Sequence, residues 1–237
     1  MPEDLCAERP LFGGAIVSTF PLRFQDVSNI RQVPDHQEVF VDLLRDESLI
    51  FELLDLKTDV ADQGSATWFL QDLANEQDAE GTMVLEQSGV FEADGLRCRS
   101  SPAIITTAVG QMAISKGRQG REAQNIVKVY LANLRLKDVA TDVLITAYEP
   151  MLIKYVPMNK FVLVITMVAL IHFPLTLRTQ NLSELETVSP LSETAATVGA
   201  GLPVPAAQSG CLPMADVFKS AVTSFKVNDW SLFGAVA

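Results

Sequence analysis

The first part of the chain alternates turn signals with short apolar runs. Residues 15–17 follow Gly13-Gly14, and residues 38–41 follow the turn dipeptide Pro34-Asp35. Glycine and proline interrupt regular structure, whereas runs rich in β-branched and aromatic residues favour extended chain. Both runs therefore predict β-strands.

Apolar residues at helical spacing indicate three helices. Asp46 is suited to cap a helix N-terminus, so a helix is expected over about 47–56. A second helix is expected over 65–76, and a third over about 214–225, because apolar residues recur there on one helical face. The three apolar faces consist of Leu49, Ile50, Leu53 and Leu54; of Trp68, Phe69 and Leu73; and of Val217, Phe218, Ala221, Val222 and Phe225.

The region between these helices is rich in β-branched residues and turns. Strands are expected near 83–87, 103–115, 124–136 and 141–148, with a glycine-bearing hairpin loop at 116–122. In the third strand apolar and polar residues alternate, which is the mark of one buried face. The alternating residues are Ala132, Leu134 and Leu136, and Asn133, Arg135 and Lys137. Strands in series with flanking helices predict an α+β fold, a twisted antiparallel sheet sandwiched between helices.

Residues 152–213 depart from this pattern. Residues 161–173 form a nearly unbroken apolar run, which even when extended to 177 contains Pro174 and falls short of the roughly 20 residues that cross a bilayer. A stretch rich in serine, alanine, glycine and proline follows over 187–213. We expect a single domain over 1–237, with an atypical apolar insertion and a flexible loop at 152–213, and no membrane as partner.

Composition narrows the class of partner. With 237 residues, 48% hydrophobic and 20% charged, the chain is typical of a folded globule. Its net charge of −11 argues against nucleic acid as a partner, because nucleic-acid binding requires a concentrated basic surface.

Three cysteines without CxxC spacing favour a reducing compartment. The acidic N-terminus, with Glu3, Asp4 and Glu8, is unlike a secretory signal or transit peptide.

The search for catalytic motifs is negative. Gly110, Lys116 and Gly117 occur in the wrong order for a phosphate-binding loop, in which the lysine follows the glycines. Of the two histidines, His172 lies within the apolar run and His36 on a polar turn. Nucleophilic catalysis needs a base, so a hydrolase would have to use His36, for which a surface position is the favoured interpretation. We expect no catalytic residue, no metal and no cofactor.

The segment 23–42 is dense with hydrogen-bonding side chains just before and at the start of a strand. Turn chemistry explains part of this, because Pro34-Asp35 is a common turn pair and Asp26 can cap a turn. Loops that carry such groups are also where binding surfaces lie. From these residues alone, the segment can be interpreted either as a turn or as a binding surface.

Three motifs in the chain are specific. They are LFGGAI at 11–16, FxDVSxIRxVPDxQEVF at 24–40 and DWSLFG at 229–234. Over 11–151 and 214–234 the chain resembles the Ran guanine nucleotide release factor family, above all its plant members. The resemblance implies a PsbP-like fold and binding to the small GTPase Ran. It also implies release of the guanine nucleotide of Ran, in support of the nuclear import machinery, by a monomer without catalytic activity in the nucleus and cytoplasm.

By motif position, the resemblance places a Ran-binding surface in the segment 24–40. Its residues would be Asp26, Asn29, Arg31, Pro34, Asp35, Gln37 and Glu38. Replacing Asp35 and Glu38 by alanine is expected to weaken Ran binding and to leave the fold intact. The segment 154–188 is absent from the family pattern and resembles an extra exon or a retained intron read in frame.

Three alternatives compete with this hypothesis. A PsbP-like protein attached to photosystem II would share the fold, but it predicts a transit peptide. An adaptor anchored to a membrane would use residues 161–177. A hydrolase would use His36 and lose its activity on His36→Ala.

Overall fold

The computed structural model describes residues 4–27, 33–91, 97–98, 101–115, 124–152 and 210–234. The strands are β1 (Cys6–Leu11), β2 (Ile16–Pro21), β3 (Gln25–Asp26), β4 (Gln37–Asp42), β5 (Glu47–Asp55), β6 (Val84–Phe91), β7 (Arg97–Cys98), β8 (Ser101–Pro102), β9 (Ile104–Ser115), β10 (Gln124–Leu136), β11 (Thr141–Leu152) and β12 (Lys226–Val227). The α-helices are α1 (Ser65–Glu76) and α5 (Met214–Thr223). Short 3-10 turns are η1 (Phe12–Gly14), η2 (Asp62–Gly64), η3 (Glu80–Thr82), η6 (Lys137–Val139) and η8 (Trp230–Phe233).

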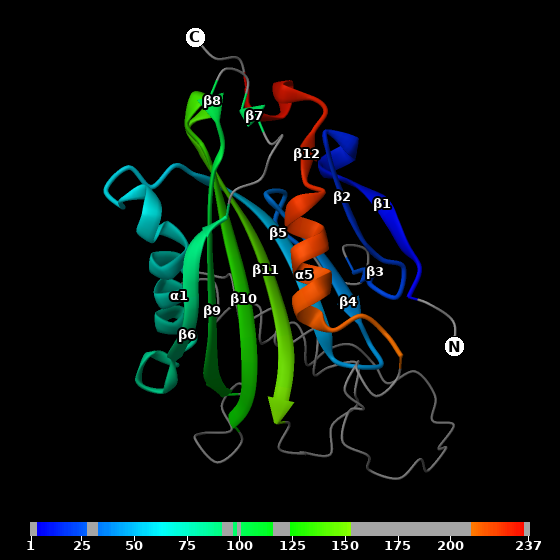
Figure 1. The fold of residues 1–237 in the computed structure, drawn as a ribbon, viewed down its shortest axis with the longest axis vertical. Helices are drawn as coiled ribbons and strands as arrows, with labels where there is room; N and C mark the ends of the chain where they lie inside the picture. Colours follow the sequence, from blue (N-terminus) through cyan, green and yellow to red (C-terminus); the bar gives the residue numbers. More distant parts are fainter. Residues whose placement is uncertain are drawn as a thin grey trace, which may run out of the picture.

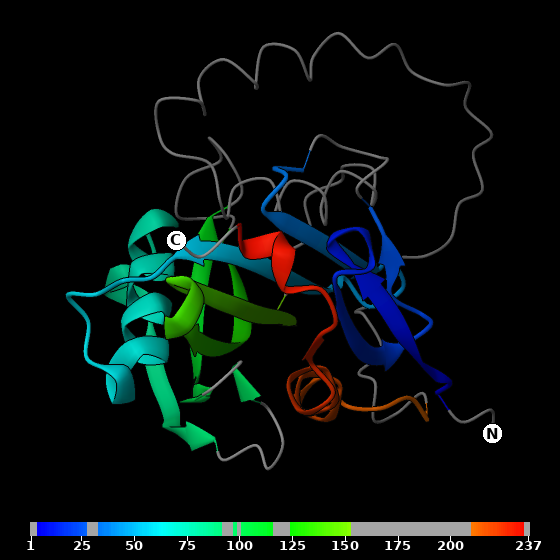
Figure 2. The ribbon, with the colours of Figure 1, turned by 90° about the horizontal axis from the view of Figure 1, so that it is seen from above.

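The strands form one large sheet and two small ones. The main sheet has the order β3-β4-β5-β11-β10-β9-β6, and every neighbouring pair is antiparallel. A second sheet has the order β1-β2-β12, and β7 pairs with β8. Helix α1 lies on one side of the main sheet, whereas α5 and the second sheet lie on the other (Figures 1 and 2). The predicted α+β fold, an antiparallel sheet between helices, is confirmed.

Each face of the main sheet has its own hydrophobic cluster. On the α5 face, Phe20 and Phe51 pack with Val217 and other residues of α5. On the α1 face, Ile50 and Leu70 belong to the second cluster. The predicted helices over 65–76 and 214–225 are confirmed, because their apolar stripes are the sides that these clusters bury. The predicted strands at 83–87, 103–115, 124–136 and 141–148 correspond to β6, β9, β10 and β11.

The predicted helix over 47–56 is wrong. This segment is β5, which lies between β4 and β11 near the middle of the main sheet. Leu49 and Phe51 face the α5 cluster and Ile50 faces the α1 cluster, so the strand is buried on both faces. A short continuous apolar run fits a buried strand as well as a helix, and only its neighbours decide between them. Asp46 is a turn residue with φ 56, not a helix cap.

The strand β1 has no counterpart among the predicted elements. Residues Cys6–Leu11 pair antiparallel with β2, in the register Leu11↔Ile16. Its first five residues alternate between exposed and half-buried, and only Leu11 is fully buried. The segment has no run of β-branched or aromatic residues, so the local pattern did not reveal this strand.

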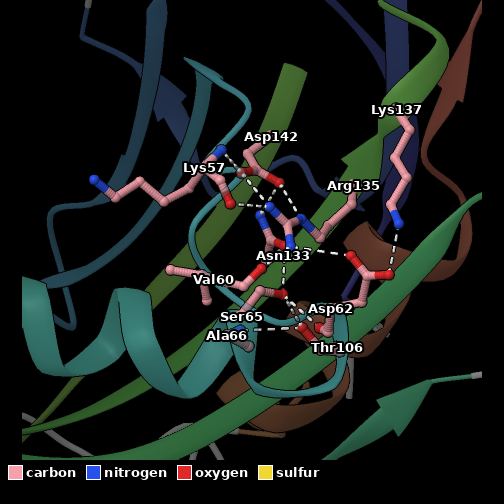
Figure 3. Close-up of polar contacts among 10 residues, drawn as sticks. All are labelled: Lys57, Val60, Asp62, Ser65, Ala66, Thr106, Asn133, Arg135, Lys137 and Asp142. Carbon is pink, nitrogen blue, oxygen red and sulfur yellow. Dashed lines mark hydrogen bonds and ion pairs between the residues drawn. The ribbon is translucent and has the colours of Figure 1, made fainter. Parts of the chain in front are cut away.

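The polar side of β10 is buried, which corrects the prediction of a single buried face. Asn133 is 0% exposed and Arg135 is 3% exposed. Figure 3 shows the Arg135 guanidinium surrounded by acceptors from three parts of the chain. Its Nε donates to Asp142 Oδ1 at 3.0 Å, and its NH1 donates to the Val60 carbonyl at 2.7 Å and to Asp62 Oδ1 at 3.0 Å.

The network continues from Arg135 to the start of α1. Asn133 Nδ2 donates to Asp142 Oδ1 at 3.1 Å, and Ser65 Oγ donates to Asn133 Oδ1 at 2.7 Å. Lys57 N–H donates to Asp142 Oδ2 at 2.8 Å, and the Lys57 carbonyl accepts from Arg135. A buried charge is tolerated only when such partners satisfy it. The network therefore fastens the loop between β5 and α1 to the sheet.

Gly110 in β9 lies where a side chain has no room. A Cβ at this position would lie 2.9 Å from the Val84 carbonyl oxygen and 3.1 Å from Leu70 Cδ2. We expect Gly110→Ala to lower the free energy of unfolding by about 1–3 kcal/mol, because β6 or α1 would have to move. Chemical denaturation measures this. Gly89→Ala is the matched strand control, since a Cβ there meets nothing within 4 Å, and an equal loss in both variants would contradict the steric reason.

Some sequence predictions fall outside the described residues. They include the hairpin loop at 116–122 and almost all of 152–213, although β9 and β10 on either side of the loop pair antiparallel as expected. Among the described residues, no helix is long and apolar enough to cross a membrane. Within the same ranges, no group of three or more His, Cys, Asp or Glu side chains could hold a metal ion.

Candidate functional site

The predicted binding segment lies at the β3 edge of the main sheet. Asp26 ends β3 and is paired in register with Phe40 of β4. Residues 28–32 are outside the described ranges, and the chain then turns into β4. In this turn the Gln37 N–H donates to the Pro34 carbonyl at 2.9 Å, so the turn expected at Pro34-Asp35 is confirmed.

The structure places the expected site residues in different environments. Asp26 and Asp35 are exposed, whereas Pro34 and Glu38 are half-buried. Gln37 is only 7% exposed. Asn29 and Arg31 lie outside the described residues. We call the group Asp26, Asp35 and Glu38 the acidic edge.

Gln37 supports the acidic edge from within the sheet. Its Nε2 donates to Glu52 Oε1 at 2.6 Å, and the two residues face each other across β4 and β5. The same Glu52 oxygen lies 3.6 Å from Nε2 of His36, whose side chain is 50% exposed. The hydrogen bond to Glu52 raises the pKa of His36, while burial opposes this. His36 is thus a surface histidine whose position is fixed by a buried carboxylate.

Glu38 joins the acidic edge to the N-terminal turn. Its carboxylate accepts a hydrogen bond from the N–H of Phe12, the first residue of η1. Phe12 has φ 49, a left-handed conformation that is unfavourable for a bulky residue, and Gly13 and Gly14 continue it with φ 66 and 90. Burial raises the pKa of the Glu38 carboxyl, opposed by the Phe12 hydrogen bond and supported by Asp26. Because Glu38 also holds η1, Glu38→Gln tests its charge better than alanine does.

The C-terminal turn reaches the same end of the molecule, next to η1. The Ala15 carbonyl accepts from the N–H groups of Asn228 at 2.8 Å and of Asp229 at 3.0 Å. The η8 turn follows, with the Trp230 and Phe233 rings 5.7 Å apart. The motifs LFGGAI and DWSLFG therefore meet beside the acidic edge. The contact between the turn that carries Trp230 and the N-terminal turn could not be predicted, because no local pattern marks residues so far apart along the chain.

Acidic residues at the other end of β4 have structural partners. Arg23 lies 3.1 Å from Asp4 Oδ2, 3.5 Å from Asp42 Oδ2 and 3.2 Å from Glu47 Oε2. Arg45 NH1 lies 2.7 Å from Asp42 Oδ2. These carboxylates join the N-terminus to the turn between β4 and β5. They are mostly buried, whereas Asp26 and Asp35 are exposed and accessible to a partner.

The environment of Glu47 makes stability depend on pH. Burial raises its pKa from 4.5 to about 7, opposed by Arg23 and supported by Asp42. The folded protein therefore binds more protons than the unfolded chain in this window, so the contribution of Glu47 to stability is present below pH 4.5 and lost as the pH rises through about 7. We expect Glu47→Gln to flatten the pH dependence of Tm over this window. Glu8→Gln on the exposed side of β1 is the control, and an unchanged slope in Glu47→Gln would refute the assignment.

Proteins with the same α+β architecture are found among the solved structures. The structure of the Saccharomyces cerevisiae Ran-binding protein Mog1p matches with a TM-score of 0.57 at 21% identity, covering 97% of this chain and 99% of that chain. A point mutant of Mog1 matches with a TM-score of 0.56. At this level of identity the similarity shows that the fold is the Mog1 fold.

Comparison of the sequence with known proteins shows the family to which the chain belongs. The model of the family described as Ran-interacting Mog1 protein matches residues 9–150, and the chain belongs to this family. The Ran guanine nucleotide release factor of Danio rerio is 37% identical over 150 residues, covering 61% of this chain and 79% of that protein. That of Homo sapiens is 35% identical over 142 residues, covering 60% and 74%. The nuclear import protein mog1 of Schizosaccharomyces pombe is 32% identical over 143 residues, covering 60% and 75%.

These comparisons confirm the resemblance to the Ran guanine nucleotide release factor family that the motifs indicated. The matched range contains β2 to β10, most of β11 and the whole acidic edge, and it ends before α5. Residues 154–188, which the sequence motifs predict to be an additional segment, lie outside it.

Proposed function

We propose that this protein binds the small GTPase Ran and promotes release of its guanine nucleotide, in support of nuclear protein import. Membership of the Ran-interacting Mog1 family carries the proposal. Relatives named as Ran guanine nucleotide release factors and as a nuclear import protein support it. The site of action would be the nucleus and the cytoplasm. The protein would act as a regulator that makes and breaks no covalent bond.

The acidic edge is the proposed contact surface. Asp26 and Asp35 are exposed at the rim of the sheet, where negative charge can guide a basic partner surface into place. Glu38 and Pro34 would contribute at its half-buried centre, and Gln37 would hold the strand in position through Glu52. Asn29 and Arg31 belong to the same proposal by motif position.

Release of nucleotide would follow from linkage between two binding equilibria. A protein that binds nucleotide-free Ran more tightly than loaded Ran must weaken nucleotide binding by the same factor. A coupling free energy of about 3 kcal/mol corresponds to a weakening of roughly a hundredfold. The protein needs only a surface that distinguishes the two states of Ran, which agrees with the absence of a catalytic motif in the sequence.

A nucleotide-release assay tests the proposal. Ran loaded with a fluorescent guanine nucleotide is mixed with the full-length protein and excess unlabelled nucleotide, and the decay of fluorescence is followed. The release rate is expected to rise and to saturate with protein concentration. Binding of nucleotide-free Ran is measured in parallel by calorimetry. No acceleration, together with no heat of binding, would reject the proposed function.

A further inference from the structure

Three segments that are distant in the sequence meet at one end of the molecule. They are η1, the start of β4 and η8. Phe12 of η1 donates its N–H to Glu38 of β4, and the Ala15 carbonyl just after η1 accepts from the N–H of Asp229, just before η8, at 3.0 Å. Figure 2 shows η8, in red, beside the blue end of the second sheet.

This end exposes parts of several aromatic side chains. Phe12, Trp230 and Phe233 are half-buried and pack against the hydrophobic cluster of the α5 face. We call these residues the aromatic end. Trp230 and Phe233 also contact each other, with ring centroids 5.7 Å apart. Their positions are thus fixed by packing while each residue stays partly accessible.

The η8 turn, which carries Trp230 and Phe233, is capped by a hydrogen bond and flanked by negative charge. Asp229 Oδ1 accepts from the Ser231 N–H at 2.8 Å, which caps η8. Hydrogen bonds from Ser231 lower the pKa of the exposed Asp229 carboxyl, so it is ionised at neutral pH. Glu38, on the other side of η1, is the nearest member of the acidic edge, because it is bonded to Phe12.

We propose that the aromatic end and the acidic edge form one continuous docking surface for Ran. The aromatic end would receive an apolar side chain of Ran that is flanked by a basic residue, and the acidic edge and Asp229 would face that basic residue. Energetically dominant contact residues are enriched in tryptophan and other aromatic residues, surrounded by polar residues. Rings already fixed by packing lose little conformational entropy on binding. This inference rests on the proposed function.

Charge argues against a second copy of this chain as the occupant of this surface. The chain has a net charge of −11, and the aromatic rings are bordered by Glu38 and Asp229. Two such surfaces placed face to face would bring like charges together, which costs free energy. A partner that offers a basic and an apolar group suits the same surface.

Fluorine NMR tests the proposal on the full-length protein. The chain has two tryptophans, Trp230 and Trp68, so 5-fluorotryptophan labelling gives two resonances, and Trp68→Phe assigns them. Trp68 is also half-buried, but it lies on α1, on the opposite side of the main sheet. Addition of unlabelled nucleotide-free Ran is expected to shift or broaden the Trp230 resonance and to leave the Trp68 resonance in place.

Affinity measurements by calorimetry provide the second readout. Trp230→Ala is expected to weaken Ran binding by about tenfold or more, whereas the matched variant Trp68→Ala keeps the affinity. Ser231→Arg adds a basic side chain at an exposed position of η8 and leaves the aromatic packing in place. It is expected to weaken binding as well, so the test does not depend on the folding of Trp230→Ala.

The outcomes separate this inference from the proposed function. If calorimetry detects Ran binding but the Trp230 resonance does not move, the aromatic end is not part of the interface and the proposed function stands. If calorimetry detects no binding, the proposed function fails and this inference fails with it. A Trp230 shift that depends on protein concentration without Ran would assign the aromatic end to self-association and overturn the proposal.

Discussion

Replacing Arg135 by alanine is expected to lower the free energy of unfolding by about 3–5 kcal/mol. Arg135 and Asp142 face each other across β10 and β11, and both are almost completely buried. The variant leaves the Asp142 carboxylate without its cation, and it removes the donors that hold the Val60 and Lys57 carbonyls. An uncompensated buried charge is among the costliest changes in a protein. Urea denaturation followed by circular dichroism measures the loss.

Two variants make this experiment specific. Lys137→Ala removes an ion pair to Asp62 in which the lysine side chain is 51% exposed, and it should cost no more than about 1 kcal/mol. Arg135→Lys keeps the charge but lacks the planar set of donors, so an intermediate loss is expected. A loss in Arg135→Ala as small as that in Lys137→Ala would show that the network does not stabilise the fold.

The double variant Asp26→Arg with Asp35→Arg is expected to slow association with Ran by about tenfold or more at low salt. Both side chains are exposed at the edge of the sheet, so reversing their charge should weaken the attraction of a basic surface with little effect on packing. Stopped-flow association measured over a range of ionic strength tests this. The difference from the native protein should shrink as salt screens the charges.

The matched control changes the net charge equally at other positions. Asp72→Arg with Asp216→Arg places the same charges on α1 and α5, away from the acidic edge. Equal slowing by both double variants would assign the effect to overall charge and count against the acidic edge as the binding site. Thermal melting confirms that each variant is folded.

Elements with strong periodicity were predictable from the sequence. The apolar stripes of α1 and α5 have the helical period, and the long strands β9 and β10 lie between clear turn signals. These patterns are local, because a helix or a strand sets the direction of each side chain by itself. They were sufficient for the α+β class and for the order of most elements.

Two features of the sheet could not be read from the same patterns. β5 has a short apolar run that fits either a helix or a strand, and it is a strand because β4 and β11 pair with it on both sides. The polar residues of β10 alternate as those of a solvent-facing side would. They are buried because the loop carrying Asp62 folds over them and Asp142 neutralises Arg135. In each case one deciding partner is distant in the sequence, β11 for β5 and Asp62 for Arg135.

The binding segment was predicted from its sequence motif, but the environments of its residues came from packing. Asp26 and Asp35 are exposed, as a contact surface requires. Gln37 and Glu38 alternate in direction along β4, so Gln37 bonds Glu52 within the sheet and Glu38 bonds Phe12. The pattern of polar residues contains no information on which of them support the strand and which meet a partner.

The sequence by itself determined the family, the α+β class and the segment that carries the acidic edge, because motifs and periodicity are properties of neighbouring residues. Only the tertiary structure brought the η8 turn next to η1, whose Phe12 is bonded to Glu38. That contact depends on β12 pairing with β2 and on the Ala15 carbonyl accepting from Asp229. Long-range hydrogen bonds of this kind join residues from opposite ends of the chain, and no local pattern encodes them.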